Sequence, residues 1–178
     1  MPIQLLERPV LSKSEPFITD ELLHRADQAG MRIEYVNGLP VWEASPVILH
    51  QKVTDRIRSG MKVPLHKVDC ECIHYPDIYI LFPDGSIKRP DISIFCEDPP
   101  QQETMCETLP EVVIEIISKG YEKKDWEVSL PFYQSWNIPD IVIFDPPSGK
   151  VSHYHDGQVN TYTSPVELTF VCGCRATI

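Results

Sequence analysis

The chain has 178 residues, of which 42% are hydrophobic, and residues 1–178 are therefore expected to form one domain with one main hydrophobic core. Its 16 basic and 26 acidic residues give a net charge of −10, which argues against a module that holds nucleic acid by general attraction to phosphate. The charge does not exclude an enzyme whose carboxylates first bind a divalent cation, because the bound ion reverses the local charge.

The start of the chain bears on cellular location. Residues 1–18 contain neither a long apolar stretch nor a small-residue cleavage site, and the chain has no run of about eighteen apolar residues. We expect a cytoplasmic protein that does not enter a membrane, with residues 1–18 as an N-terminal extension.

The first predicted elements are two helices with a hairpin between them. A helix is expected over about 19–29, because a Thr or an Asp at its start can cap it. The pair Asn37-Gly38 predicts a tight turn between strands at 32–36 and 39–43, since both central residues of such a turn need a positive φ. A second helix is expected over about 46–57, where residues recur at helical spacing.

A second hairpin and a buried strand are predicted in the middle of the chain. The pair Asp84-Gly85 joins strand-like arms at 78–82 and 86–95. A polar loop follows at 97–104, where two prolines are incompatible with a central strand. The mostly β-branched run at 111–118 is typical of a strand that is covered on both faces.

The last third of the chain is predicted to contain a helix and a third hairpin. The helix covers roughly 122–136, and Pro131 should kink or split it. The pair Asp156-Gly157 joins arms at 151–155 and 158–163. Three hairpins indicate a largely antiparallel framework.

The six cysteines are not spaced like the ligands of a zinc site. Two Cys-x-Cys pairs, at 70–72 and 172–174, and the single residues Cys96 and Cys106 lack the two-residue spacing that zinc sites favour. Thiols stay reduced inside cells. We therefore expect reduced thiols that pack in the core or at strand edges, in preference to a zinc site.

Two acidic residues stand within predicted strands. Period-two alternation places Asp91 on the face opposite Ile92 and Ile94, and Glu115 lies within the apolar run that precedes Ser118. An unpaired ionised carboxylate in such a place costs several kcal/mol. The carboxylates of Asp91 and Glu115 are therefore expected to lie within a few ångströms of each other, beside buried isoleucines.

Two explanations of Glu115 are open from the residues alone. Asp91 and Glu115 can bind a hard cation such as Mg²⁺, which takes oxygen ligands and retains several waters. Alternatively, Glu115 is a structural ion-pair partner of Arg89 or Lys119, or accepts a hydrogen bond from the backbone.

Several segments between about residues 20 and 160 resemble a restriction endonuclease family that is abundant in cyanobacteria (Uma-two type), a branch of the PD-(D/E)XK nuclease superfamily. The matching residues are Ile33 to Gly38, Ser45 to Gln51, Arg89-Pro90-Asp91-Ile92-Ser93, Leu109 to Ser118, Tyr133, and Ile138 to Pro146.

The resemblance implies an α+β fold with a restriction-endonuclease-like core, in which helices flank a mixed, mainly antiparallel sheet. It further implies Asp91 and Glu115 as catalytic residues and ligands of Mg²⁺ or Mn²⁺, with Glu34 completing or orienting the metal site. Taken alone, Glu34 is typical of a solvated strand residue, and His50 of a helix-packing or capping histidine. The implied partners are nucleic acid, in the first place DNA, and a second copy of the chain in a homodimer.

The chain departs from the superfamily in its lysine. The position two residues after Glu115 is Ile117, and the position on the following helix that carries a lysine in many family members is Ser129. At 100° per residue, Lys123 and Lys124 do not face the same way as Ser129. Lys119 is then the candidate catalytic lysine, and Ser129→Lys is expected to raise cleavage if cleavage is weak.

The sequence therefore predicts an Mg²⁺-dependent, endonuclease-like hydrolase of phosphodiester bonds. The alternative is a catalytically degenerate protein that uses the nuclease fold for binding or assembly, consistent with the missing lysine. A third possibility is a hydrolase of small phosphorylated molecules. Whether the chain is an active enzyme is open at this point.

Overall fold

The computed structural model describes residues 18–44, 47–63, 70–100 and 105–178. The N-terminal extension predicted at 1–18 lies outside these ranges except for Ile18, and the predicted start of the second helix at Pro46 also lies outside them. Within the described residues, no helix is both long enough and apolar enough to span a membrane.

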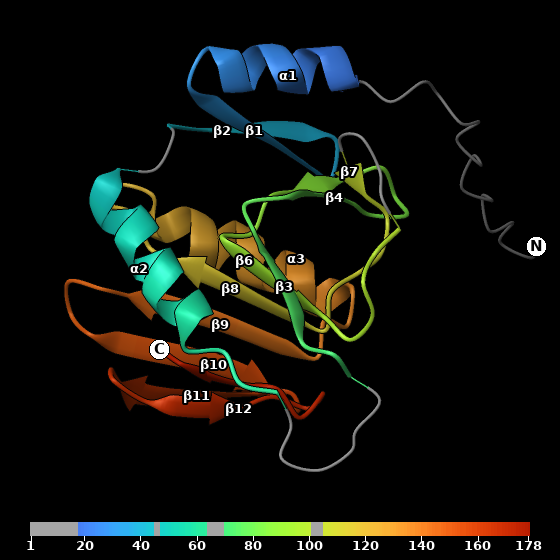
Figure 1. The fold of residues 1–178 in the computed structure, drawn as a ribbon. Helices are drawn as coiled ribbons and strands as arrows, with labels where there is room; N and C mark the ends of the chain where they lie inside the picture. Colours follow the sequence, from blue (N-terminus) through green and yellow to red (C-terminus); the bar gives the residue numbers. More distant parts are fainter. Residues whose placement is uncertain (1–17, 45–46, 64–69, 101–104) are drawn as a thin grey trace, which may run out of the picture.

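A six-stranded sheet forms the centre of the protein (Figure 1), in the order β11-β10-β9-β8-β6-β3. All neighbouring strands are antiparallel except β8 and β9, which are parallel. The strands are β3 (Ile73–Pro76), β6 (Ile92–Phe95), β8 (Val112–Ile116), β9 (Asp140–Asp145), β10 (Lys150–His155) and β11 (Gln158–Thr163).

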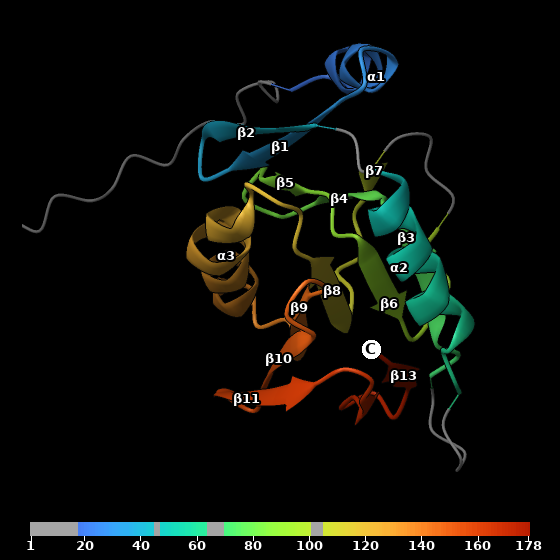
Figure 2. The same cartoon turned by 90° about the vertical axis from the view of Figure 1, so that its left-hand side faces the viewer.

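Helices cover both faces of this sheet (Figure 2). Helix α2 (Ile48–Ser59) lies on one face, and the π-helical segment η1 (Lys124–Ser129), which continues into α3 (Leu130–Ser135), lies on the other. Strand β8 is buried along its whole length between these two layers, as its β-branched sequence predicts. This arrangement confirms the predicted α+β class with a mixed, mainly antiparallel sheet.

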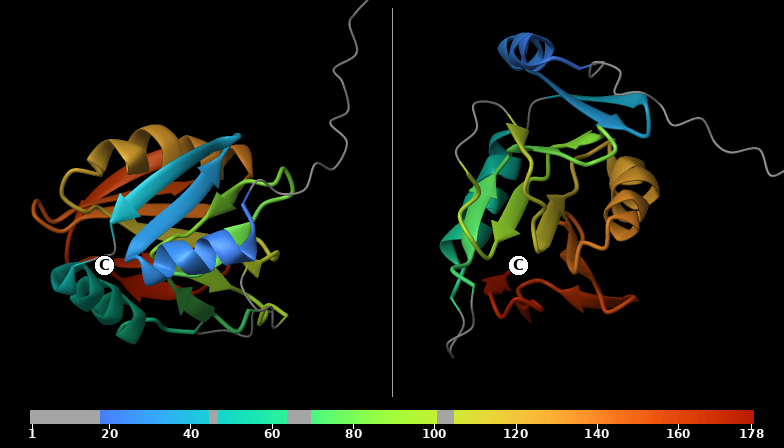
Figure 3. Two further views of the ribbon diagram at one scale, coloured as in Figure 1. Left: turned by 90° about the horizontal axis from the view of Figure 1, so that it is seen from above. Right: turned by 90° about the vertical axis from the view of Figure 1, so that its right-hand side faces the viewer.

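A second sheet covers one end of the molecule (Figure 3), in the order β2-β1-β5-β4-β7. Helix α1 (Asp20–Gln28) packs against it, and the Thr19 side chain caps α1 by accepting a hydrogen bond from Leu22 N, as expected. Its strands are β1 (Met31–Val36), β2 (Leu39–Ala44), β4 (Tyr79–Leu81), β5 (Ile87–Lys88) and β7 (Met105–Cys106). Strands β12 (Glu167–Thr169) and β13 (Arg175–Thr177) form a separate pair.

The first and third predicted hairpins are confirmed, and the second is shorter than predicted. Strands β1 with β2 and β10 with β11 pair through the Asn-Gly and Asp-Gly turns. The second hairpin ends at β5, after which the chain leaves it and forms β6 against β3. Pro90 lies at this break, and a proline has no backbone N–H to continue a strand ladder.

The expectation that all cysteines are reduced is wrong for one pair, because Cys72 and Cys174 form a disulfide across 102 residues. Cys72 immediately precedes β3, and Cys174 immediately precedes β13. The remaining described cysteines, Cys70, Cys96, Cys106 and Cys172, are free thiols. Local spacing did not reveal this pairing, because it is made by tertiary structure.

Candidate active site

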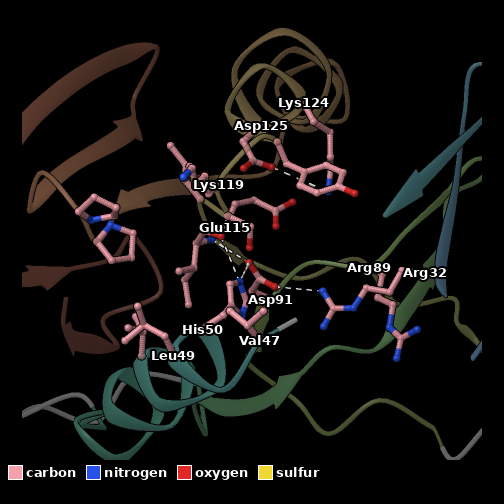
Figure 4. A pocket seen from close by; sticks show the side chains of 17 residues that line it. Arg32, Val47, Leu49, His50, Arg89, Asp91, Glu115, Lys119, Lys124 and Asp125 are labelled. Carbon is pink, nitrogen blue, oxygen red and sulfur yellow. Dashed lines mark hydrogen bonds and ion pairs between the residues drawn. The ribbon is translucent and has the colours of Figure 1, made fainter. Parts of the chain in front are cut away.

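Asp91 and Glu115 line the same cavity, which has a volume of about 440 Å³. The antiparallel register pairs Ile92 with Ile114, so Asp91, which immediately precedes β6, lies near the end of β8 that carries Glu115. Figure 4 shows both carboxylates pointing into the cavity. Ile92, Ile94 and Ile114 are fully buried beside them, as predicted.

Asp91 is held by hydrogen bonds and charge on both carboxylate oxygens. Its Oδ2 accepts from Ile116 N at 2.8 Å and lies 3.1 Å from His50 Nε2, while its Oδ1 lies 3.3 Å from the Arg32 guanidinium. Burial alone would raise the pKa of Asp91, but the bonds from His50 and Ile116 and the charge of Arg32 outweigh burial and lower it. His50 thus contacts Asp91 directly, and its contact with the Ile116 carbonyl oxygen at 3.1 Å also packs α2 against β8.

Glu115 has the opposite electrostatic character. Burial raises the pKa of Glu115 to about 8; the positive charges of Lys124 and Lys88 oppose this rise, and the negative charges of Asp125 and Asp91 add to it. The Tyr133 hydroxyl donates to Glu115 Oε1 at 2.7 Å. Two buried carboxyl groups in one cavity therefore hold different protonation states near neutral pH, as is typical of functional sites.

This raised pKa predicts how stability depends on pH in the absence of divalent cations. Between pH 4.5 and about pH 8, folded Glu115 keeps a proton that the unfolded chain releases, so the free energy of unfolding falls as pH rises through this window. We expect Glu115→Gln to remove a component of this fall on the order of 2–4 kcal/mol. Urea denaturation at several pH values, with a chelator present, measures it, and parallel pH profiles for the two proteins would contradict the assignment.

Glu34 is fully buried, so the expectation of a solvated strand residue is wrong. Its Oε2 lies 2.5 Å from Lys88 Nζ, and its Oε1 accepts from Arg89 N at 2.9 Å. Burial alone would raise the pKa of Glu34, but the charges of Lys124 and Lys88 with these hydrogen bonds lower it to about 2.

The structure does not bring Glu34 together with both other carboxylates. Among the described residues, Asp91, Glu115 and Glu34 do not form a group whose ligand atoms all lie within 4.8 Å of one another. Glu34 instead contacts Lys88 and Lys124. The charges of these two lysines also oppose the rise in the pKa of Glu115.

A lysine also lies beside Ser129, contributed by a different element. Lys88 in β5 has no exposed surface, and its Nζ donates to Ser129 Oγ at 2.9 Å. Ser129 is itself fully buried. In the variant Ser129→Lys, a second ammonium would be buried directly against the first, which the sequence alone does not reveal.

The prediction that Lys124 faces away from the site is also wrong. Residues Lys124–Ser129 form a π-helix, whose i→i+5 hydrogen bonds stack residues five apart, so the step of 100° per residue does not apply. Lys124 Nζ lies 3.3 Å from Glu34 Oε2 and lines the cavity. Lys119, labelled in Figure 4, lines the cavity as well, and it is exposed.

Comparison with known proteins identifies the family. Residues 19–170 match the family described as "Uma2: Putative restriction endonuclease". The chain belongs to this family. Comparison with curated proteins returns no match.

A solved structure shares the fold of this chain. It is described as "a putative nuclease belonging to DUF820", from Anabaena variabilis, and its TM-score with this chain is 0.55 at 16% sequence identity. The similarity covers 77% of this chain and 80% of that chain. This Uma2 chain therefore has the nuclease-like fold that the sequence resemblance implied.

The sequence predicted Asp91 and Glu115, which line the cavity, but it did not indicate the buried Lys88 or the contact between His50 and Asp91. One signal in the sequence could have indicated Lys88. It immediately precedes Arg89-Pro90-Asp91, the segment that carries the first acidic residue of the site. Alternation within one strand does not reveal that β5, a strand of the second sheet, faces the helical segment that carries Ser129.

Proposed function

We propose that this Uma2 protein is a divalent-metal-dependent endonuclease that hydrolyses phosphodiester bonds in DNA. The observation that carries the proposal is that Asp91 and Glu115 line one cavity together with the lysine side chains of Lys119 and Lys124. A cavity of about 440 Å³ is within the usual range for small-ligand sites, and it is large enough for part of one nucleotide.

The donor atoms fit a hard divalent cation. Asp91 and Glu115 offer carboxylate oxygens, which Mg²⁺ and Mn²⁺ prefer, and two carboxylates leave positions for the waters that Mg²⁺ retains. Burial raises the pKa of Glu115 despite the charges of Lys124 and Lys88, and a divalent cation bound beside Glu115 would lower that pKa and favour the carboxylate form. When bound, the ion stabilises negative charge that develops on the phosphoryl oxygens.

The protein's own side chains have distinct proposed tasks. His50 and Ile116 N fix the orientation of the Asp91 carboxylate. Lys124, whose side chain is 10% exposed, presents an ammonium at the cavity wall, where it can stabilise the charge of the transition state. Lys119 is exposed at the cavity edge, so we assign it to binding the phosphate backbone.

Two lysine variants test this assignment. We expect Lys124→Met to lower Mg²⁺-dependent or Mn²⁺-dependent cleavage by about 10²–10³-fold, because a pre-organised donor to the transition state is lost. Lys119→Met should mainly weaken DNA binding and its salt dependence, with a smaller effect on the cleavage rate at saturation. Single-turnover cleavage of labelled DNA, together with binding measured at several salt concentrations, separates the two roles.

One experimental result would contradict the proposal directly. If neither Mg²⁺ nor Mn²⁺ raises the thermal midpoint or supports cleavage of DNA or RNA by the folded wild-type protein, the site is structural. Lys123→Met is the matched control, because Lys123 is an exposed neighbour of Lys124 that does not line the cavity. Cleavage confined to small phosphorylated molecules would instead favour a different hydrolase.

A further inference from the structure

Five of the six cysteines gather at one place, away from the candidate active site. They come from three separate segments: the residues that precede β3, the residue that follows β6, and the turn between β12 and β13. The five are Cys70, Cys72, Cys96, Cys172 and Cys174. Packing of thiols in a core does not require such convergence.

Three of these cysteines are free thiols with the geometry of a metal site. The sulfur atoms of Cys70, Cys96 and Cys172 all lie within 4.8 Å of one another. Around tetrahedral zinc, with Zn–S bonds of about 2.3 Å, sulfur atoms lie about 3.8 Å apart. The three thiols therefore need to approach by no more than about 1 Å to share one ion.

The disulfide lies beside this triad without using any of its members. The Sγ atom of Cys70 lies 3.4 Å from that of Cys174 and 4.0 Å from that of Cys72. The backbone at the cluster is unusual in two places: Cys72 has a φ of 53°, which is uncommon for a residue with a side chain, and Gly173 has a φ of 86°. The turn at Gly173 allows both Cys172 and Cys174 to join the cluster.

Two acidic side chains lie next to the triad. Glu111 Oε2 accepts from Cys96 N at 2.9 Å, and Asp140 Oδ2 accepts from Val171 N at 2.8 Å, next to Cys172. Thiolate ligands are soft and select zinc over Mg²⁺ or Ca²⁺. We propose that Cys70, Cys96 and Cys172 bind one Zn²⁺ as thiolates, with water in the fourth position because Cys96 and Cys172 are partly exposed.

The test uses the full chain with the Cys72–Cys174 bond intact, verified by mass spectrometry. After incubation with Zn²⁺ and dialysis, we expect about one zinc per chain by elemental analysis. Zinc should also slow alkylation of Cys70, Cys96 and Cys172 by iodoacetamide, while Cys106 reacts as before. This second measurement needs no variant and therefore does not depend on whether a substituted chain folds.

Variants give the matched comparison. Cys70→Ser should weaken zinc binding by at least about 100-fold, because it removes a direct ligand, whereas Cys106→Ser and the double variant Cys72→Ser/Cys174→Ser should retain it. Wild-type protein that holds no zinc after dialysis, or unchanged alkylation of the triad, would overturn the proposal. Zinc lost in His155→Gln but kept in Cys70→Ser would also overturn it, by placing the ion at Asp140, His153 and His155.

Discussion

Glu115→Gln should abolish stabilisation by Mg²⁺ and metal-dependent cleavage, yet leave the protein without divalent cations as stable as the wild type or more stable. The substitution preserves the shape of the side chain and removes the charge that a cation needs. It also removes an ionisable group whose burial raises its pKa to about 8. For the wild type, a cation at 100 times its dissociation constant should add about 2.7 kcal/mol to the free energy of unfolding.

Thermal melts with and without Mg²⁺ measure this difference. Glu127→Gln is the control, because Glu127 is an exposed residue of η1 and should leave the response to Mg²⁺ unchanged. If Glu115 is instead a structural ion-pair partner, Glu115→Gln should lose roughly 3–5 kcal/mol without divalent cations, and the wild type should show no response to Mg²⁺. That pattern would end the metal-site proposal.

Moving the buried ammonium from β5 to the helix should be tolerated far better than removing or duplicating it. Lys88→Ser leaves the Glu34 carboxylate buried with less compensation, and Ser129→Lys adds a second buried ammonium. We expect each single variant to lose about 3 kcal/mol or more of the free energy of unfolding. The double variant Lys88→Ser/Ser129→Lys restores one ammonium facing one hydroxyl, and should recover at least about 2 kcal/mol relative to the sum of the single losses.

Urea denaturation of the four proteins gives the coupling energy directly. Losses that simply add in the double variant would show that Lys88 and Ser129 do not share one ammonium position. Lys123→Ser provides the control for loss of a lysine from the exposed surface of the same region. Recovery of cleavage in the double variant, alongside recovery of stability, would further connect the buried ammonium to the proposed active site.

The carboxylate pair was predictable from sequence because its information is local. Alternation within two strands places Asp91 and Glu115 among apolar neighbours, and adjacent strands in register then bring them together. The Asx-Gly turns likewise specify two hairpins by their own chemistry. In each case, a few neighbouring residues determine the outcome.

The parts that were not predictable depend on contacts between distant segments or on a local departure from ideal geometry. Lys88 reaches Ser129 across 41 residues, and the cysteines converge although none has zinc-like spacing along the chain. Lys124 was assigned the wrong direction because an α-helical rotation was applied to a π-helix. Burial of Glu34 followed from the packing of the second sheet, which the pattern of β1 alone does not reveal.

The lengths of chain that separate these contacts imply an order of assembly during folding. The carboxylate of Asp91 meets β8 across 25 residues, whereas the Cys72–Cys174 bond closes a segment of 102 residues. Closing the longer segment from a flexible chain costs about 1 kcal/mol more in entropy, and contacts that are distant in sequence form more slowly. We therefore expect the acidic pair to be assembled on the path to the native state before the cysteines meet.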